Sequence, residues 1–174
     1  MTNTQRPYTG FDKVGTSTDP SAKKLAELLG RRFGMSYMGG LVVRVMRSAP
    51  GNIQKLDPSD PRCKPYMSVH ASGRAIDVGH SDPDVLTKVF NFLVEYADEL
   101  SIEEVHQYNY RAPKAAKAWG RGFRCSRASK DAGVKIFTAS DNAGTPGGMW
   151  IHYEVSGKLD AKTIEANFRA TPKT

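Results

Sequence analysis

Apolar residues recur at helical spacing in several segments of the chain. The first predicted helix covers residues 20–30, because Asp19 can cap it, a proline suits its first turn and its apolar stripe comprises Leu25, Leu28 and Leu29. The second begins after Ser81 or Asp82 and runs to about residue 100, with apolar side chains at Val85, Leu86, Val89, Phe90, Leu93 and Tyr96. A closing helix is predicted over residues 160–168.

Three other segments have the composition of β-strands. Residues 41–46 are rich in β-branched side chains and lie between a glycine and a proline, which predicts a buried strand that ends near Arg47. Residues 102–110 also read as a strand. Residues 149–155 alternate well enough to form a core strand.

The remaining segments predict loops and an N-terminal arm. Residues 1–18 are polar and indicate an extended or loosely held arm before a domain that spans residues 19–174. Prolines in residues 48–68 predict a long irregular loop, and residues 112–119 fit at most one helical turn inside a basic loop. The mixed order of elements favours an α+β single domain, with a mostly antiparallel sheet and flanking helices, over a doubly wound parallel sheet.

Composition adds limits on the class of protein. The chain has 174 residues, 39% of them hydrophobic, which suits one globular domain with its own core. No apolar run is long enough to cross a bilayer, and the N-terminus lacks the basic start and apolar stretch of a secretory signal. We therefore expect synthesis in a cytosol and, if the protein leaves, another exit route. Cys63 and Cys125 lie in no C-x-x-C motif and are predicted to be free thiols.

The net charge of +7 predicts attraction to anionic polymers, either nucleic acid or an acidic bacterial cell wall. Residues 108–124 mix basic and aromatic side chains, but they match no nucleic-acid-binding module. A solvated loop is the preferred interpretation of this stretch. Nucleic acid is therefore an unlikely partner on sequence grounds.

A ten-residue segment from Ser68 to Asp77 contains the first part of the candidate chemistry. Within it, an imidazole at His70 and the Asp77 carboxylate are seven residues apart, with small residues between them. Gly73 would let the backbone turn closely, so that both side chains reach one point. Imidazole and carboxylate are ligands that zinc accepts, and two histidines with one acid suffice for a catalytic site with one open position.

The third ligand is predicted to be His152. It lies in the strand-like run at residues 149–155, where Trp150 and Glu154 would share its face of the strand. We therefore predict that His70, Asp77 and His152 hold a single zinc ion, next to an aromatic wall and a further acid.

The motif at residues 68–77 matches S-x-H-x-x-G-x-A-x-D at all five specified positions. It resembles the signature of the D-Ala-D-Ala carboxypeptidase and L-alanyl-D-glutamate endopeptidase family. Chance should give such a match on the order of once in several thousand chains of this length. The upstream residues Arg47, Ser48 and Gln54 look like the family's R-S…Q segment, and His-Tyr-Glu at 152–154 looks like its last ligand strand.

The resemblance implies a fold like those of Hedgehog and the D-Ala-D-Ala peptidases. It also implies zinc-dependent hydrolysis of a peptide bond in the peptidoglycan stem. Many relatives are phage endolysins or virion-associated lysins, so the resemblance implies synthesis in the host cytoplasm and action at the bacterial cell wall, with other virion proteins as potential partners.

Residue roles follow from the same resemblance. His70, Asp77 and His152 would be the zinc ligands, and the zinc would polarise the scissile carbonyl. Arg47 would stabilise the developing oxyanion or bind a substrate carboxylate. Ser68 would orient the ligand loop beside the substrate, and Trp150 would pack beside the substrate as well.

One departure from the family concerns the general base. Family peptidases usually have an acid three residues before the last histidine, where this chain has Met149. Glu154, Asp141 and His80 are the candidate substitutes, and a base must come within hydrogen-bond reach of the attacking water. Glu154 is favoured because it shares the ligand's strand face, although it could instead be a structural acid that orients the ligand.

Two rival functions follow. A virion or tail domain could keep the fold and the metal but only bind wall peptides, and the missing base favours this alternative. A nucleic-acid-binding protein is motivated by charge alone. His106 has no partner at metal-binding spacing and is expected at the surface or at a pocket rim.

Overall fold

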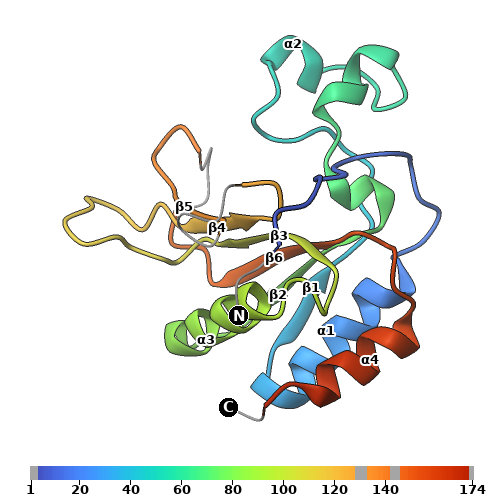
Figure 1. Ribbon diagram of the computed structural model, residues 1–174. Coiled ribbons are helices and arrows are strands. Elements are labelled where there is room, and N and C mark those ends of the chain that lie inside the picture. The colour runs from blue at the N-terminus through green and yellow to red at the C-terminus, as the bar shows by residue number, and fades with distance from the viewer. Residues whose placement is uncertain (1–3, 128–132, 142–145, 173–174) are drawn as a thin grey trace.

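The computed structural model describes residues 4–127, 133–141 and 146–172. Its centre is a sheet of six strands that are antiparallel throughout, in the order β1-β2-β6-β3-β4-β5 (Figure 1). The strands are β1 Ser36–Gly39, β2 Ala75–Gly79, β3 Ile102–Gln107, β4 Arg121–Arg124, β5 Val134–Ile136 and β6 Trp150–Val155. The predicted α+β class with a mostly antiparallel sheet and flanking helices is confirmed.

Three helices lie on one face of the sheet (Figure 1). They are α1 Pro20–Phe33, α3 Pro83–Glu95 and α4 Ala161–Ala170. Of these, α1 and α3 pack against strands, and α4 packs against α1. An aspartate caps each helix, because its carboxylate accepts backbone N–H groups of the first turn, and these caps are Asp19, Asp82 and Asp160. The first helix runs three residues beyond the predicted stop at Gly30 and ends at Gly34, which adopts a left-handed conformation.

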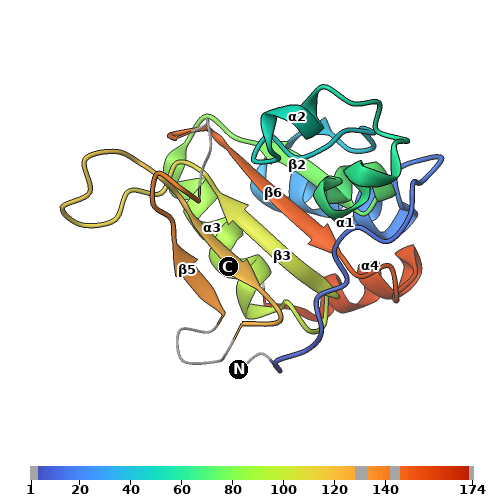
Figure 2. The same ribbon diagram turned by 90° about the horizontal axis from the view of Figure 1, so that it is seen from above.

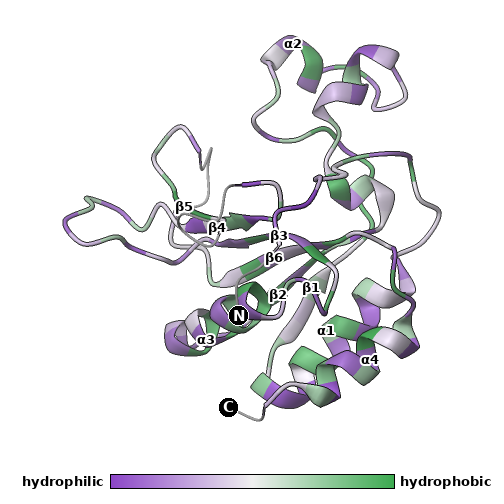
Figure 3. Cartoon of the chain, in the orientation of Figure 1, coloured by the Kyte–Doolittle hydropathy of each residue, from purple (hydrophilic) through white to green (hydrophobic). Residues whose placement is uncertain are grey.

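The main core lies between these helices and the sheet. Its fully buried side chains include Leu25 and Leu29 of α1, Phe90 of α3, and Ile151 and Tyr153 of β6. Hydrophobic and hydrophilic residues alternate around the helices, as the mixed colours of α1 and α4 in Figure 3 show. Burial of the apolar stripe therefore fixes which way each helix faces.

Residues 48–72 form a layer on the opposite face of the sheet (Figures 1 and 2). They contain three short helices, α2 Gly51–Gln54, η1 Pro61–Tyr66 and η2 Val69–Ser72. A small second core holds them together and comprises Ala49, Ile53, Cys63, Met67 and Ala71. Both cysteines are free, as predicted.

The strand predicted over residues 41–46 is wrong. The segment is extended, but Val42 and Val43 are exposed, and only Val45 forms a β-bridge, with Met67. Its backbone pairs with η2 and with the residue before it, because the Val42 N–H donates to the His70 carbonyl and the Ser68 N–H donates to the Arg44 carbonyl. The β-branched composition thus reflects an extended conformation and not burial.

Other differences lie in short elements. The strand predicted at residues 102–110 ends at Gln107, and residues 112–119 form turns without a helix. Two short strands follow, β4 within the stretch that reads as a basic loop and β5 beyond it. Their lengths of four and three residues leave too little alternation for a sequence pattern.

Within the described residues, no helix has the length and apolar character needed to span a membrane.

Residues 4–18 form an arm without helix or strand that crosses the ends of β3 and β6 (Figure 2). The arm is hydrogen-bonded along its length and is not loosely held. The Arg6 N–H donates to the Cys125 carbonyl at 3.0 Å, and the Gly15 N–H donates to the Ala71 carbonyl at 2.8 Å.

Candidate metal centre

One row of residues crosses the sheet at the candidate site. Asp77 of β2 lies opposite His152 of β6, which in turn lies opposite His106 of β3. The row continues to Gly39 on β1 at one end, and to Gly122 on β4 and Lys135 on β5 at the other. Residues directly opposite each other in an antiparallel sheet point to the same face, so the register places one carboxylate and two imidazoles side by side.

The remaining ligand comes from the turn that enters β2. Ser68 caps η2, because its hydroxyl accepts the His70 N–H at 3.4 Å, and the helix ends at Gly73. Gly73 has a φ of +79°, and a Cβ at this position would overlap the Ser17 carbonyl of the arm. The motif glycine is therefore required both for the backbone turn and for the close approach of the arm.

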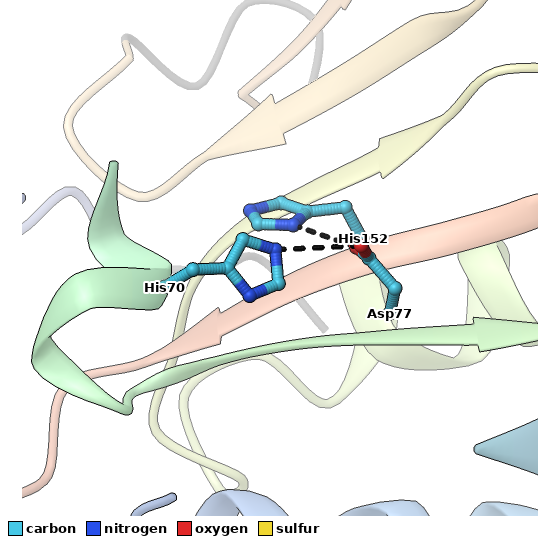
Figure 4. A group of neighbouring side chains, drawn as sticks. All are labelled: His70, Asp77 and His152. Carbon is cyan, nitrogen blue, oxygen red and sulfur yellow. Dashed lines mark hydrogen bonds and ion pairs between the residues drawn. The ribbon is translucent and has the colours of Figure 1, made fainter. Parts of the chain in front are cut away.

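His70, Asp77 and His152 converge on one point (Figure 4). One ligand atom from each lies within 4.8 Å of the others. The His70 Nε2 atom is 3.4 Å from Asp77 Oδ2, and His152 Nδ1 is 3.0 Å from Asp77 Oδ1. Two ligand atoms on a tetrahedral zinc ion lie about 3.4 Å apart, given bonds of about 2.1 Å. The spacing of the three side chains therefore fits such an ion.

The outer nitrogen of each histidine is held by an acceptor. His70 Nδ1 is 2.6 Å from the Gly40 carbonyl, and His152 Nε2 is 3.0 Å from Glu154 Oε1. A carbonyl and a carboxylate only accept, so both outer nitrogens carry a hydrogen, and the inner nitrogens are the ones that would offer lone pairs to a metal. Metal-binding histidines are typically oriented in this way.

The site is buried on the protein side and open on one edge. His70 and His152 are 4% and 8% exposed, whereas the Asp77 side chain is 30% exposed. Burial alone would lower the pKa of His152, but its hydrogen bonds to Asp77 and Glu154 raise it to about 10. Burial would raise the pKa of Asp77, but hydrogen bonds from both histidines hold it well below its usual range. In the absence of a metal, His152 is therefore protonated, and its proton lies between His152 and Asp77, where the cation would bind.

His106 is arranged like His152 on the neighbouring strand. The two rings are 5.4 Å apart, and His106 Nε2 lies 3.2 Å from Glu104 Oε1, as His152 Nε2 lies beside Glu154. The phenol oxygen of Tyr108 is 3.3 Å from His106 Nδ1. Gly122 makes room for this ring, because a Cβ there would lie 2.8 Å from His106 Cδ2.

The other residues predicted for the site lie around it or away from it. Ser68 is buried under the ligand turn, and Trp150 is half-buried with its ring 5.1 Å from that of Tyr108. Glu154 is 4% exposed and contacts His152 on the edge of the ring that faces away from Asp77, which favours an orienting acid over a base.

Three other predicted residues have no described contact with the cluster. Arg47 is exposed in the turn before α2, and no described hydrogen bond or ion pair joins its guanidinium to the cluster. Asp141 binds Lys135 at 2.5 Å and Thr138, at the β5 edge of the sheet. His80 accepts the Asp82 N–H at 2.9 Å at the start of α3.

Sequence reasoning missed four residues that surround the cluster. Glu104 and His106 share one face of β3 beside the candidate ligands, and Tyr108 follows directly after that strand. The alternation of residues 102–110 could have placed the three together. Burial and the charge of Asp77 raise the pKa of Tyr108, and the positive charge of Arg44 opposes this shift. Arg44 is the fourth of these residues, and its guanidinium donates to the Val45 carbonyl.

Comparisons with protein-family models, curated proteins and solved structures gave no match to this chain.

Proposed function

We propose that the chain is a zinc-dependent peptidase that hydrolyses peptide bonds of bacterial peptidoglycan, with the fold of the Hedgehog and D-Ala-D-Ala peptidase type. The convergence of His70 Nε2, Asp77 and His152 Nδ1, with both outer nitrogens held, is the observation that carries the proposal. Two imidazoles and one carboxylate suit zinc better than calcium or magnesium, which prefer oxygen ligands. The motif at residues 68–77 supplies the substrate class.

Zinc at this position would supply a Lewis acid for the scissile carbonyl. The chain's own residues supply proton transfer and charge. With its Nε2–H donated to Glu104, His106 has an acceptor at Nδ1, which accepts the Tyr108 hydroxyl at 3.3 Å in the free protein. Once that hydroxyl turns to the substrate, Nδ1 takes the proton of the attacking water and returns it to the leaving amine nitrogen. Glu104 is 3% exposed and stabilises the imidazolium that forms.

The other residues bind and orient the substrate. Tyr108 presents a hydroxyl and Arg44 a positive charge near the ligands, and both suit a developing oxyanion or a substrate carboxylate. Trp150, packed on Tyr108, forms an apolar wall. The net charge of +7 brings the enzyme onto an anionic wall.

Digestion of purified peptidoglycan tests this function. The wild-type protein, loaded with one equivalent of zinc, should release soluble peptides with new amino termini, and a chelator should stop the release. His106→Ala should keep its zinc and lose about 100-fold or more in rate, while His80→Ala, which alters a histidine away from the cluster, should keep both. Zinc without cleavage on walls of several chemotypes would instead favour a wall-binding domain of a virion.

A further inference from the structure

The N-terminal arm contacts the carboxylates that orient the histidines of the candidate metal centre. Arg6 attaches it to the start of β3, since its guanidinium donates to the Ala97 carbonyl at 2.9 Å and pairs with Asp98 at 3.0 Å. The Thr9 hydroxyl donates to Glu103 at 2.6 Å. The arm is thus fixed on both sides of Tyr8, in the position that Figure 2 shows across the ends of β3 and β6.

Tyr8 lies between the two carboxylates that orient the histidines of the site. Its phenol oxygen is 2.7 Å from Glu154 Oε2 and 3.3 Å from Glu104 Oε2. The other oxygen of Glu154 holds His152, and the other oxygen of Glu104 holds His106. Tyr8 has one hydrogen to donate, and the shorter contact assigns it to Glu154.

The two carboxylates repel each other because they are cross-strand neighbours, and the Tyr8 hydroxyl lies between them. Glu104 and Glu154 are opposite each other in the register of β3 and β6 and are 3% and 4% exposed. Like charges at directly opposite positions destabilise a sheet. Arg124 compensates Glu104 at 2.7 Å and packs over the Tyr8 ring at 4.3 Å, whereas Glu154 has Tyr8 as the donor to its second oxygen.

We propose that the arm is a working part of the metal centre, and that Tyr8 is the positioning residue through which it acts. The hydroxyl fixes Glu154, Glu154 fixes the ring of His152, and His152 Nδ1 is thereby aimed at the metal. Detachment of the arm weakens metal binding although the arm supplies no ligand. The inference rests on the proposed metal site and requires no hydrolysis.

Tyr8→Phe is the sharpest test, because it removes the hydroxyl and keeps the ring under Arg124. Tyr96→Phe is the matched control, since Tyr96 lies at the end of α3 and is buried in the main core, on the helical face of the sheet. Zinc affinity is measured by competition with a chromophoric chelator. Loss of a residue that orients a ligand lowers metal affinity about 10- to 100-fold, and Tyr8→Phe should fall in that range while Tyr96→Phe binds as the wild type does.

A spectroscopic readout separates positioning from general loss of stability. Cobalt in place of zinc gives visible bands that report ligand geometry, and Tyr8→Phe should change their position or intensity, whereas Tyr96→Phe should not. Equal zinc affinity and equal cobalt spectra for Tyr8→Phe and wild type would overturn the role of the arm alone. If the wild type bound neither metal, the metal site and this inference would both be wrong.

Discussion

Zinc binding should expel one proton from His152 near neutral pH. In the metal-free protein, burial alone would lower the pKa of this imidazole, but Asp77 and Glu154 raise it to about 10. At pH 7 the imidazole is therefore predominantly protonated. Because the metal requires the Nδ1 lone pair, it competes with the proton that lies between His152 and Asp77.

The apparent zinc affinity should therefore rise about tenfold per pH unit between roughly pH 7 and pH 9, since one proton is exchanged for one ion. Isothermal titration in buffers of different ionisation enthalpy counts the protons, and about one per zinc is expected at pH 7.5. Glu154→Gln removes one of the two negative partners of His152 and should shift the steep region to lower pH. A pH-independent affinity without proton release would refute the assignment of His152.

The same two residues set how stability of the metal-free protein depends on pH. The pKa of His152 is raised on folding from its ordinary value of about 6.5, so its stabilisation is complete below that pH and is lost as pH rises toward 10. The pKa of Asp77 is depressed, so its stabilisation is present above about pH 4 and is lost as pH falls further. Urea titrations should place the stability maximum between roughly pH 4 and 6.5.

Three substitutions test other parts of the account. His70→Ala should abolish stoichiometric zinc binding and also the stabilisation by zinc, which for the wild type is about 2.7 kcal/mol at 100 times the Kd; unchanged metal content would contradict the ligand set. Gly73→Ala should cost about 1–3 kcal/mol in urea unfolding, because its φ of +79° and the Ser17 carbonyl leave no place for a Cβ. Arg74→Met should cost about 3–5 kcal/mol, because it leaves the buried Glu103 carboxylate without its cation at 3.4 Å, and an unchanged unfolding midpoint would show that this pair contributes nothing.

The sequence predicted two of the three candidate ligands together because they are close in the chain, and it predicted His152 from the strand-like run at residues 149–155. Seven residues separate His70 from Asp77, and the small residues between them permit the turn that brings them together. His106 escaped prediction because its position depends on the register between β3 and β6. Both strands were recognised from their composition, but alternation along one strand does not specify which strand lies beside it.

Extended segments were the main source of error in the fold. Residues 41–46 have the composition of a buried strand, yet Val42 and Val43 are exposed and the segment pairs with the ligand turn. Arg47 was predicted from the resemblance of residues 47–54 to the family's R-S…Q segment, but it is exposed in the turn before α2. The arm at residues 4–18 has no periodicity, and its role depends on single contacts such as that of Tyr8 with Glu154.

Metal content of the purified protein tests the central claim most directly. After loading with zinc and removal of free metal, mass spectrometry of the wild type should find one zinc per chain, and Asp77→Asn and His152→Ala should each retain far less. Glu154→Gln should bind zinc more weakly but still measurably, because Glu154 orients a ligand and is not one. A wild type without zinc, or ligand variants that retain it fully, would contradict the metal centre described for His70, Asp77 and His152.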